Sequence, residues 1–493
     1  VATAASLDAA ALWQDVTVDT IGVTDEWTNK VELADIDGDG LVDLLFANGG
    51  DYETPGAPAA SQVFLIQGSG QQFKEATEQV FGPAKMLARV IKVRDVNADG
   101  TADIMVGTTY QTQSRLYLGD GSGGFVDVTA TNLPHLNASV GDLEFGDVDG
   151  DRDLDLILAD WGAGSPMNNG GGRTMLWLND GSGAFTDATA AQMPDVLVKF
   201  SWELELVDVD NDYDLDVLVS CKMCSGSFLF ENDGTGTFTD VSAGRLPQFS
   251  NNYDFEAMDV NGDAYLDLVT INDGPDFREH LLLNNQQGGF VDATMDLWPF
   301  TENRSCDDNM DVFLDIDSDG DADLLIGSLD CSDRVLVNDG SGSLTLLNKS
   351  QAVMPGTPGT LGLAVADLNG DHRLDVVQAQ GEAASPEKVF FGQSIPPDTA
   401  APVITLVENV DSTAAGQPIE IRARVHDSKS PTMPHDWQSV ALVWTAQGET
   451  RTAPMQWYGE YLWRAAIDDV PAAGFTYQVC ARDAAGNEAC AAP

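Results

Sequence analysis

The chain has 493 residues, with 79 acidic against 24 basic side chains, which gives a formal net charge of −55. This excess of negative charge argues against nucleic acid and anionic membranes as partners, because both are polyanions. The sequence contains no run of eighteen apolar residues, so we expect no membrane span.

The first strongly patterned stretch is Asp35–Asp43, which has Asp at positions 1, 3, 5 and 9 of a glycine-bearing turn. Hard divalent cations prefer such oxygen ligands, and alternate side chains of a curled loop can supply them. Position 7, Leu41, would add a backbone carbonyl. The stretch predicts a calcium-binding loop.

The same pattern recurs six more times, so we expect seven loops, about seven bound Ca²⁺ ions and a structural role for the metal. Position 3 is Asn in three loops, where it keeps a ligating oxygen but loses the charge. The predicted ligands at positions 1, 3, 5, 7 and 9 of loops 1 to 7 are Asp35, Asp37, Asp39, Leu41 and Asp43; Asp95, Asn97, Asp99, Thr101 and Asp103; Asp147, Asp149, Asp151, Asp153 and Asp155; Asp208, Asp210, Asp212, Asp214 and Asp216; Asp259, Asn261, Asp263, Tyr265 and Asp267; Asp315, Asp317, Asp319, Asp321 and Asp323; Asp367, Asn369, Asp371, Arg373 and Asp375.

An EF-hand interpretation fails in every copy, because that loop needs a Glu at position 12 and helices on both sides. Position 12 is never acidic here, and short apolar runs such as 31–33 and 44–46 flank the loops. These flanks predict β-strands, so each loop joins two strands of a hairpin.

The loops begin 51 to 61 residues apart, which is typical of four-stranded propeller blades. The second half of each unit also repeats, as in Leu116–Phe125 and Leu176–Phe185, where a Gly-rich turn separates two apolar runs. We therefore expect each unit to contain a strand, a calcium loop, a strand, a variable loop, a strand, a Gly-rich turn and a strand.

The last unit stops at Val389–Gly392 and lacks its outer strand, whereas a similar strand occurs near the start of the chain, at 12–18. We infer that this N-terminal strand completes the last blade, because ring closure removes an exposed sheet edge.

These units resemble FG-GAP (VCBS-type) repeats, which form the seven-bladed propeller of the integrin α head. The resemblance covers about residues 10–393. It implies an all-β, seven-bladed propeller, although integrin propellers usually carry calcium loops in only some blades. It also suggests recognition or adhesion, a function that the fold alone does not establish.

The expected domains are a propeller over 1–393, a Pro-rich linker over 394–402 and a small β-sandwich over 403–493. Alternating strands such as 419–423 and 440–444 support the sandwich. Its ending, Tyr477–Asn487, resembles immunoglobulin-like and fibronectin-type modules.

The six cysteines form three local pairs, for which we expect structural disulfides: Cys221 with Cys224, Cys306 with Cys331, and Cys480 with Cys490. A redox role for the first pair is disfavoured, because that motif expects a helix N-terminus in a thioredoxin-like context. Disulfides and calcium loops together predict a secreted or cell-surface protein.

The variable loops and the loops between units should share the face opposite the calcium loops, and they carry many aromatic residues. We expect a protein or glycan ligand to bind there; packing between blades is the alternative. The aromatic residues are Trp27, Tyr52, Phe200, Trp202, Tyr253, Phe277, Trp298 and Phe300.

Acidic residues also alternate along the predicted innermost strands and should point together towards the central channel. They are Glu32, Asp142, Glu144, Glu203, Glu205, Asp254 and Glu256. A further cation site is one interpretation. We favour hydration or pairing with Lys30, Arg89 and Lys92.

The sequence therefore favours a monomeric, non-catalytic recognition or adhesion protein. One alternative is a carbohydrate-binding propeller. Another is a polysaccharide lyase or hydrolase, which would need Glu144, Glu205 or Glu256 close together with a shifted pKa.

Overall fold

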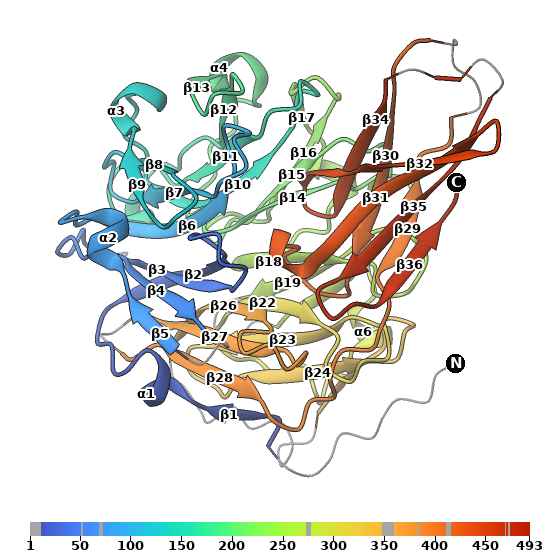
Figure 1. Ribbon diagram of the computed structural model, residues 1–493. Helices are drawn as coiled ribbons and strands as arrows, with labels where there is room; N and C mark the ends of the chain where they lie inside the picture. Colours follow the sequence, from blue (N-terminus) through green and yellow to red (C-terminus); the bar gives the residue numbers. More distant parts are fainter. Residues whose placement is uncertain are drawn as a thin grey trace.

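The computed structural model describes residues 11–50, 53–68, 72–272, 278–347, 359–382, 385–410, 416–468, 470–471 and 474–493. Within these ranges the chain is nearly all β and forms nine four-stranded antiparallel sheets, seven from β1–β28 and two from β29–β36 (Figure 1). No helix in the described part of the chain is long and apolar enough to cross a membrane.

Six of the seven propeller sheets take their strands in chain order from the inner to the outer edge. The first three sheets contain β2 (Thr28–Ala34), β3 (Asp43–Asn48), β4 (Gln62–Gln67) and β5 (Gln72–Glu75); β6 (Ala88–Arg94), β7 (Asp103–Thr108), β8 (Arg115–Gly119) and β9 (Phe125–Asp127); β10 (Val140–Gly146), β11 (Asp155–Asp160), β12 (Met175–Asn179) and β13 (Phe185–Asp187). The next three contain β14 (Leu204–Val207), β15 (Asp216–Val219), β16 (Phe228–Asn232) and β17 (Phe238–Asp240); β18 (Asn252–Met258), β19 (Asp267–Asn272), β20 (His280–Asn284) and β21 (Phe290–Asp292); β22 (Asp308–Leu314), β23 (Asp323–Ser328), β24 (Arg334–Asn338) and β25 (Leu344–Leu346).

The last propeller sheet joins the two ends of this region. It contains β26 (Thr360–Ala366), β27 (Asp375–Gln380), β28 (Lys388–Gly392) and β1 (Trp13–Asp15). Trp13 lies opposite Gly392, its indole Nε1 donates a 3.0 Å hydrogen bond to the Leu374 carbonyl, and its side chain is only 3% exposed. The N-terminal strand thus supplies an outer strand that the last unit lacks.

This strand is shorter than the expected range of 12–18, because β1 ends at Asp15 and the chain turns into helix α1 (Thr17–Thr20). The Asp15 carboxylate accepts the backbone N–H of Thr17 at 3.0 Å, which caps the turn. Equivalent turns follow the outer strands of five other sheets, in α2 (Thr77–Phe81), α3 (Thr129–Asn132), α4 (Thr189–Gln192), α5 (Ser242–Arg245) and α6 (Thr294–Leu297).

Apolar side chains pack between neighbouring sheets. Leu45, Ile91 and Ile104, for example, belong to one buried cluster that joins the first two sheets. Six of the seven innermost strands shift register near their first residues, as between Thr28 and Lys30. Such a bulge inserts one extra residue and changes the direction of its side chain.

The C-terminal residues form two facing sheets. One contains β29 (Val403–Val407), β30 (Ile419–His426), β34 (Leu462–Ile467) and β33 (Gln456–Gly459); the other contains β32 (Glu449–Pro454), β31 (Trp437–Ala446), β35 (Thr476–Asp483) and β36 (Glu488–Ala491). Their shared core includes Ile421, Leu442, Trp463 and Val479. We call residues 403–493 the C-terminal module.

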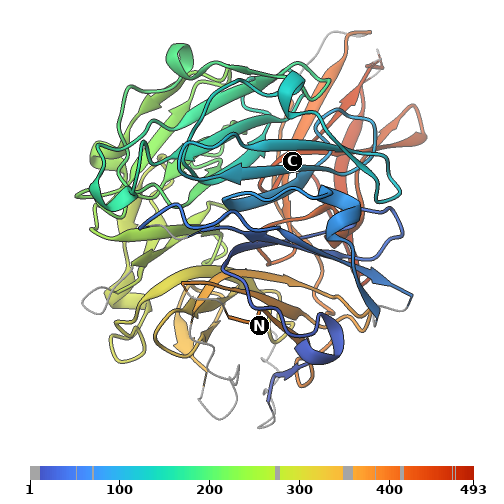
Figure 2. The ribbon, with the colours of Figure 1, turned by 90° about the vertical axis from the view of Figure 1, so that its left-hand side faces the viewer.

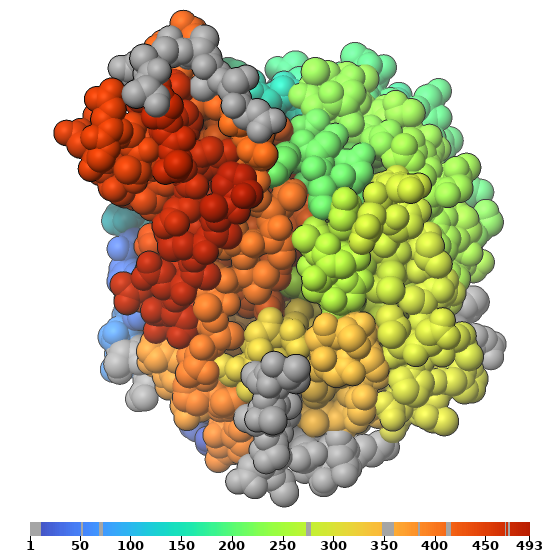
Figure 3. Space-filling view, turned by 90° about the vertical axis from the view of Figure 1, so that its right-hand side faces the viewer, coloured from blue at the N-terminus to red at the C-terminus, as the bar shows by residue number. Residues whose placement is uncertain are grey.

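This module lies against one side of the propeller, as the orange to red strands show in Figure 2 and the corresponding atoms in Figure 3. Its propeller partners are mainly loop residues: Ser428 Oγ donates to the Gly320 carbonyl at 2.8 Å, and Tyr458 Oη donates to the Tyr213 carbonyl at 3.0 Å. Arg464 and Arg424 of the module also contact Asp147 of loop 3 and Ala264 of loop 5, so the module covers loops 3 to 6.

Candidate metal centres and the central channel

Backbone N–H groups fix the first carboxylate of every loop. In loop 1, Asp35 accepts N–H groups from Gly38 and Gly40, both at 2.8 Å. The N–H of position 6 makes the same bond in the other six loops. The N–H of position 7 donates to the position-5 Asp, as from Leu41 to Asp39 at 2.9 Å. These bonds curl each loop and turn its carboxylates inwards.

Position 6 of each loop has a positive φ, which ordinarily favours glycine. Gly40 occupies it in loop 1 at +85°, whereas Arg152, Tyr213 and His372 hold φ values of +83°, +71° and +62°. A left-handed conformation at such side chains persists only where the surroundings impose it. In these loops the hydrogen bond from the position-6 N–H to the position-1 Asp holds the left-handed conformation in place.

The position-9 Asp has a structural role in all seven loops. In loop 1, Asp43 accepts the N–H of Ile36 at 3.0 Å and the N–H of Ile66, on the third strand of the sheet, at 2.7 Å. Equivalent pairs of bonds are present in the other loops. Burial raises the pKa of Asp43 to about 8, despite these two bonds.

The loop carboxylates meet in at least four of the seven loops. Single oxygens of three acidic side chains lie within 4.8 Å of one another in the groups Asp35, Asp37 and Asp39; Asp147, Asp149 and Asp155; Asp208, Asp210 and Asp212; and Asp315, Asp317 and Asp323. Several carboxylates gathered in one short turn repel one another unless a cation neutralises them. The donors are all oxygens, which suits a hard ion such as Ca²⁺.

These four loops are the ones with Asp at position 3. In the other three, the Asn amide nitrogen donates to a carboxylate of its own loop, as from Asn261 Nδ2 to Asp267 at 3.0 Å. An ion there would require the amide oxygen to turn inwards, a rotation that exchanges two nearly isosteric groups. The backbone carbonyls expected as ligands at position 7 stay a prediction.

Two arginines from the C-terminal module contact position-1 carboxylates. Arg424 donates to Asp208 of loop 4 at 3.0 Å, and Arg464 pairs with Asp147 of loop 3. All four side chains are buried. Any cation in these two loops would share its first ligand with a guanidinium. No feature of the repeats signalled these partners.

Most described aromatics of the variable-loop face are packed inside the protein. Trp161, Phe200, Trp202 and Tyr253 form a buried cluster in which the rings of Trp161 and Trp202 stack at 5.5 Å. Trp298 is also buried, whereas Phe300 is 57% exposed. Packing explains the buried side chains, so the expected aromatic binding surface is largely absent from the described residues. Tyr52 and Phe277 lie outside the described residues.

All three expected disulfides are present: Cys221–Cys224, Cys306–Cys331 and Cys480–Cys490.

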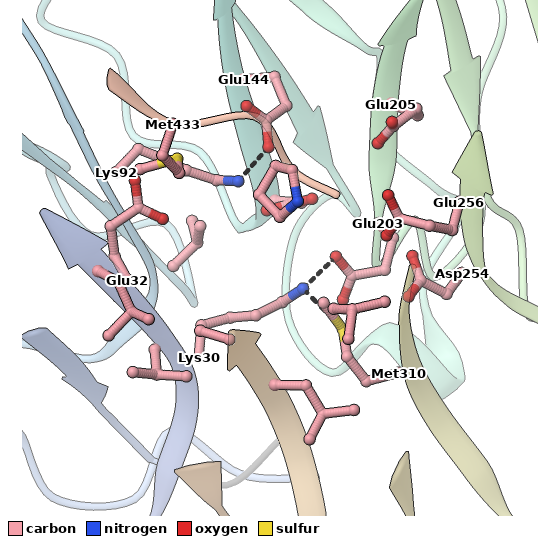
Figure 4. A pocket seen from close by; sticks show the side chains of 18 of the residues that line it. Lys30, Glu32, Lys92, Glu144, Glu203, Glu205, Asp254, Glu256, Met310 and Met433 are labelled. Atoms are coloured by element: carbon pink, nitrogen blue, oxygen red, sulfur yellow. Dashed lines mark hydrogen bonds and ion pairs between the residues drawn. The ribbon is translucent and has the colours of Figure 1, made fainter. Parts of the chain in front are cut away.

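The predicted inner-strand acids line a central cavity of about 70 Å³ (Figure 4). Several of them form the expected ion pairs: Lys30 with Glu203 at 2.5 Å, and Lys92 with Glu144. Arg89 Nη2 approaches Glu203 Oε1 at 3.7 Å, and Arg94, which was not among the expected partners, pairs with Glu32 at 3.0 Å.

Comparison with known proteins identifies the family to which the repeats belong. The model of the FG-GAP-like repeat matches residues 35–106, 95–158, 208–270 and 315–377, which together make up just over half of the chain. No curated protein matches the sequence.

Similar solved structures include an Agrocybe aegerita lectin described as recognising non-reducing terminal N-acetylglucosamine, at 18% identity and TM-score 0.43, covering 66% of this chain and 82% of the lectin. The Vibrio cholerae biofilm matrix protein Bap1 has 14% identity and TM-score 0.36, over 98% of this chain and 76% of that one. An ancestral GH74 enzyme has 12% identity and TM-score 0.41, and the match covers 98% of this chain and 63% of that enzyme. Likenesses at this level carry no functional argument. The repeat matches show the family: the chain belongs to the proteins with FG-GAP-like repeats.

Proposed function

We propose that this protein is an extracellular, calcium-stabilised propeller that recognises a protein or glycan ligand through its variable-loop face, without catalysis. The observation that carries the proposal is the position of the C-terminal module. It lies on the calcium loops, through contacts such as Arg424–Asp208, and leaves the variable-loop face as the broad exposed end of the propeller.

The variable-loop face is built from the loops after the second strands and the loops between sheets, which pair with each other, as Gly172 does with Val198. Five exposed apolar side chains lie on these loops: Val23, Met167, Leu197, Met223 and Phe300. Exposed apolar groups on a rigid scaffold support a binding surface. The three disulfides support an oxidising, extracellular location.

The central cavity favours binding over catalysis. A volume of about 70 Å³ holds a few water molecules or a hydrated ion, and a sugar ring is larger than that. This small volume is an argument against a polysaccharide substrate beside the inner-strand acids.

The test measures binding of the labelled chain to immobilised extracellular matrix proteins and polysaccharides, with calcium and after chelation. Replacing Met167 and Phe300 together by Ala should reduce binding at least tenfold. The matched control replaces Val126 and Val291 by Ala; they are at least as exposed as the tested pair but lie on outer strands β9 and β21. Equal loss in both variants would contradict the assignment of the face.

A cleft of about 450 Å³ supports carbohydrate binding as a second candidate. It lies between loops 1 and 2 and the C-terminal module, and its lining includes Arg94, Thr101, His435 and Trp437. Clefts between packed units are common ligand sites, and an indole beside polar groups suits a sugar. Replacing Trp437 by Ala should abolish any binding to an oligosaccharide array; unchanged array binding would exclude this cleft.

A further inference from the structure

The central cavity carries far more acid than base. Eight carboxylates and three lysines line it, from the innermost strands and from the C-terminal module: Glu32, Asp142, Glu144, Glu203, Glu205, Asp254, Glu256 and Glu460, with Lys30, Lys92 and Lys429. Lys429 itself pairs with Asp436 at 3.0 Å. Two lysines therefore remain to balance eight acids inside the cavity.

The ion pairs neutralise only one side of this lining. Lys30 engages Glu203, Lys92 engages Glu144, and Arg94 reaches in to engage Glu32. Asp142 is held by a backbone N–H from Leu204 at 3.3 Å. The acids on β14 and β18, which are Glu205, Asp254 and Glu256, have no cationic partner among these contacts.

Within the described residues, Glu205, Asp254, Glu256 and Glu460 have no ion pair. Asp254 and Glu256 are only 4% and 6% exposed. One oxygen each of Glu205, Asp254 and Glu460 lacks any hydrogen-bond partner. Burying such oxygens as anions without a partner is strongly unfavourable.

The four side chains influence one another electrostatically. Burial, then the carboxylates of Glu460 and Glu256, raises the pKa of Glu205 well above its ordinary value. Burial raises the pKa of Asp254 to about 7, although Lys30 opposes the rise. The group thus gathers negative charge that either protons or a cation must neutralise.

We infer that this cavity binds one hydrated divalent cation, held by Asp254, Glu256 and Glu205, with Glu460 of the C-terminal module closing the site. Figure 4 shows Glu203, Glu205, Asp254 and Glu256 facing the same space from neighbouring strands. The volume accommodates an ion that keeps part of its water shell, and carboxylates are the ligands that Mg²⁺ and Ca²⁺ prefer.

The site is separate from the calcium loops. Its acids lie on the strands before the loops, three or five residues ahead of position 1, and on an element outside the repeats. The module residues Met433 and Pro431 also line the cavity. An ion bound here would therefore connect the propeller to the module and exchange more slowly than ions in the exposed loops.

The direct test is anomalous diffraction from crystals of the full chain grown with Mn²⁺. The expected result is a peak inside the central cavity beside Asp254 and Glu256, in addition to any peaks in the loops. Peaks in the loops alone, with ordered water in the cavity, would overturn the inference.

A paired solution test counts bound ions per chain after desalting. The variant Asp254→Asn/Glu256→Gln, which keeps side-chain shape, should lose one ion, whereas the control Glu78→Gln/Asp296→Asn, on exposed helices, should lose none. In metal-free buffer the cavity variant should melt at or above the wild-type temperature, because its acids no longer repel. An unchanged ion count in the folded variant would overturn the site; if the variant does not fold, the diffraction result decides.

Discussion

Arg424, from the C-terminal module, donates to the first carboxylate of loop 4, Asp208, at 3.0 Å, and both side chains are completely buried. The same guanidinium also donates to the backbone carbonyls of Asp208 and Ala264, each at 3.0 Å. A single side chain thereby ties the module to two neighbouring calcium loops.

Replacing Arg424 by Met should destabilise the protein by about 3–5 kcal/mol, because a buried carboxylate would lose its only cationic side-chain partner among the described contacts. Urea unfolding measures the change. Arg451→Met is the matched control, since its pair with Glu449 is largely exposed and worth at most about 1 kcal/mol. Equal effects of the two substitutions would show that the buried pair does not hold the interface.

Replacing Asp317 and Asp319 together by Ala should remove one bound calcium ion and lower the gain in melting temperature that calcium provides. Both residues lie in loop 6, where Asp317 belongs to a carboxylate cluster. Ion counting and thermal unfolding across a calcium titration provide the two readouts. Asp296→Ala, on an exposed helix, is the control. An unchanged gain in saturating calcium would contradict the loop assignment.

The calcium-free protein should become less stable as the pH rises from about 5 to 8. The pKa values of Asp43, Asp155 and Asp267 are raised to about 8, mainly by burial, whereas an unfolded Asp titrates near 3.9. Between these values the folded state binds more protons, so its stability is greatest at low pH and declines as pH rises through the folded pKa.

In metal-free buffer, the free energy of unfolding measured with urea should fall by at least about 1 kcal/mol between pH 5 and pH 8. Saturating calcium should flatten the profile, because the ion replaces the protons. Stability that increases with pH in the metal-free protein would contradict the burial of unneutralised carboxylates.

Replacing Trp13 by Ala should cost about 3–5 kcal/mol, because its buried indole packs in the last propeller sheet and bonds to Leu374. Deleting residues 1–20 should have a larger effect and make β28 accessible to proteases. Val18→Ala, at an exposed position nearby, is the control. Wild-type stability after the deletion would contradict closure by the N-terminal strand.

The sequence predicts local features of this protein well. The loop pattern, the flanking strands and the three cysteine pairs each depend on residues close together in the chain, and the structure contains them. The sequence does not predict that position 9 also holds the third strand of the sheet, as Asp43 does by accepting the N–H of Ile66. The motif shows only the pattern of metal ligands.

Long-range contacts could not be predicted. Arg464 lies 317 residues from Asp147, and Glu460 enters the channel from outside the repeats, so no periodicity indicates either contact. The aromatic residues were misleading for another reason. Trp161 and Trp202 occur in loops, where exposure is the usual expectation, but their rings stack in a buried cluster between sheets.

The pairing of β1 with β28 also constrains how the protein can fold during synthesis. Trp13 meets Leu374 across 361 residues, so during synthesis β1 stays unpaired until one of the last strands of the propeller has been made. Until then its apolar side chain and unpaired backbone are free to associate with other chains. Contacts of such long sequence separation also slow folding. We therefore expect refolding yield to fall with protein concentration, and a chain whose first strand is moved to follow β28 should escape that dependence.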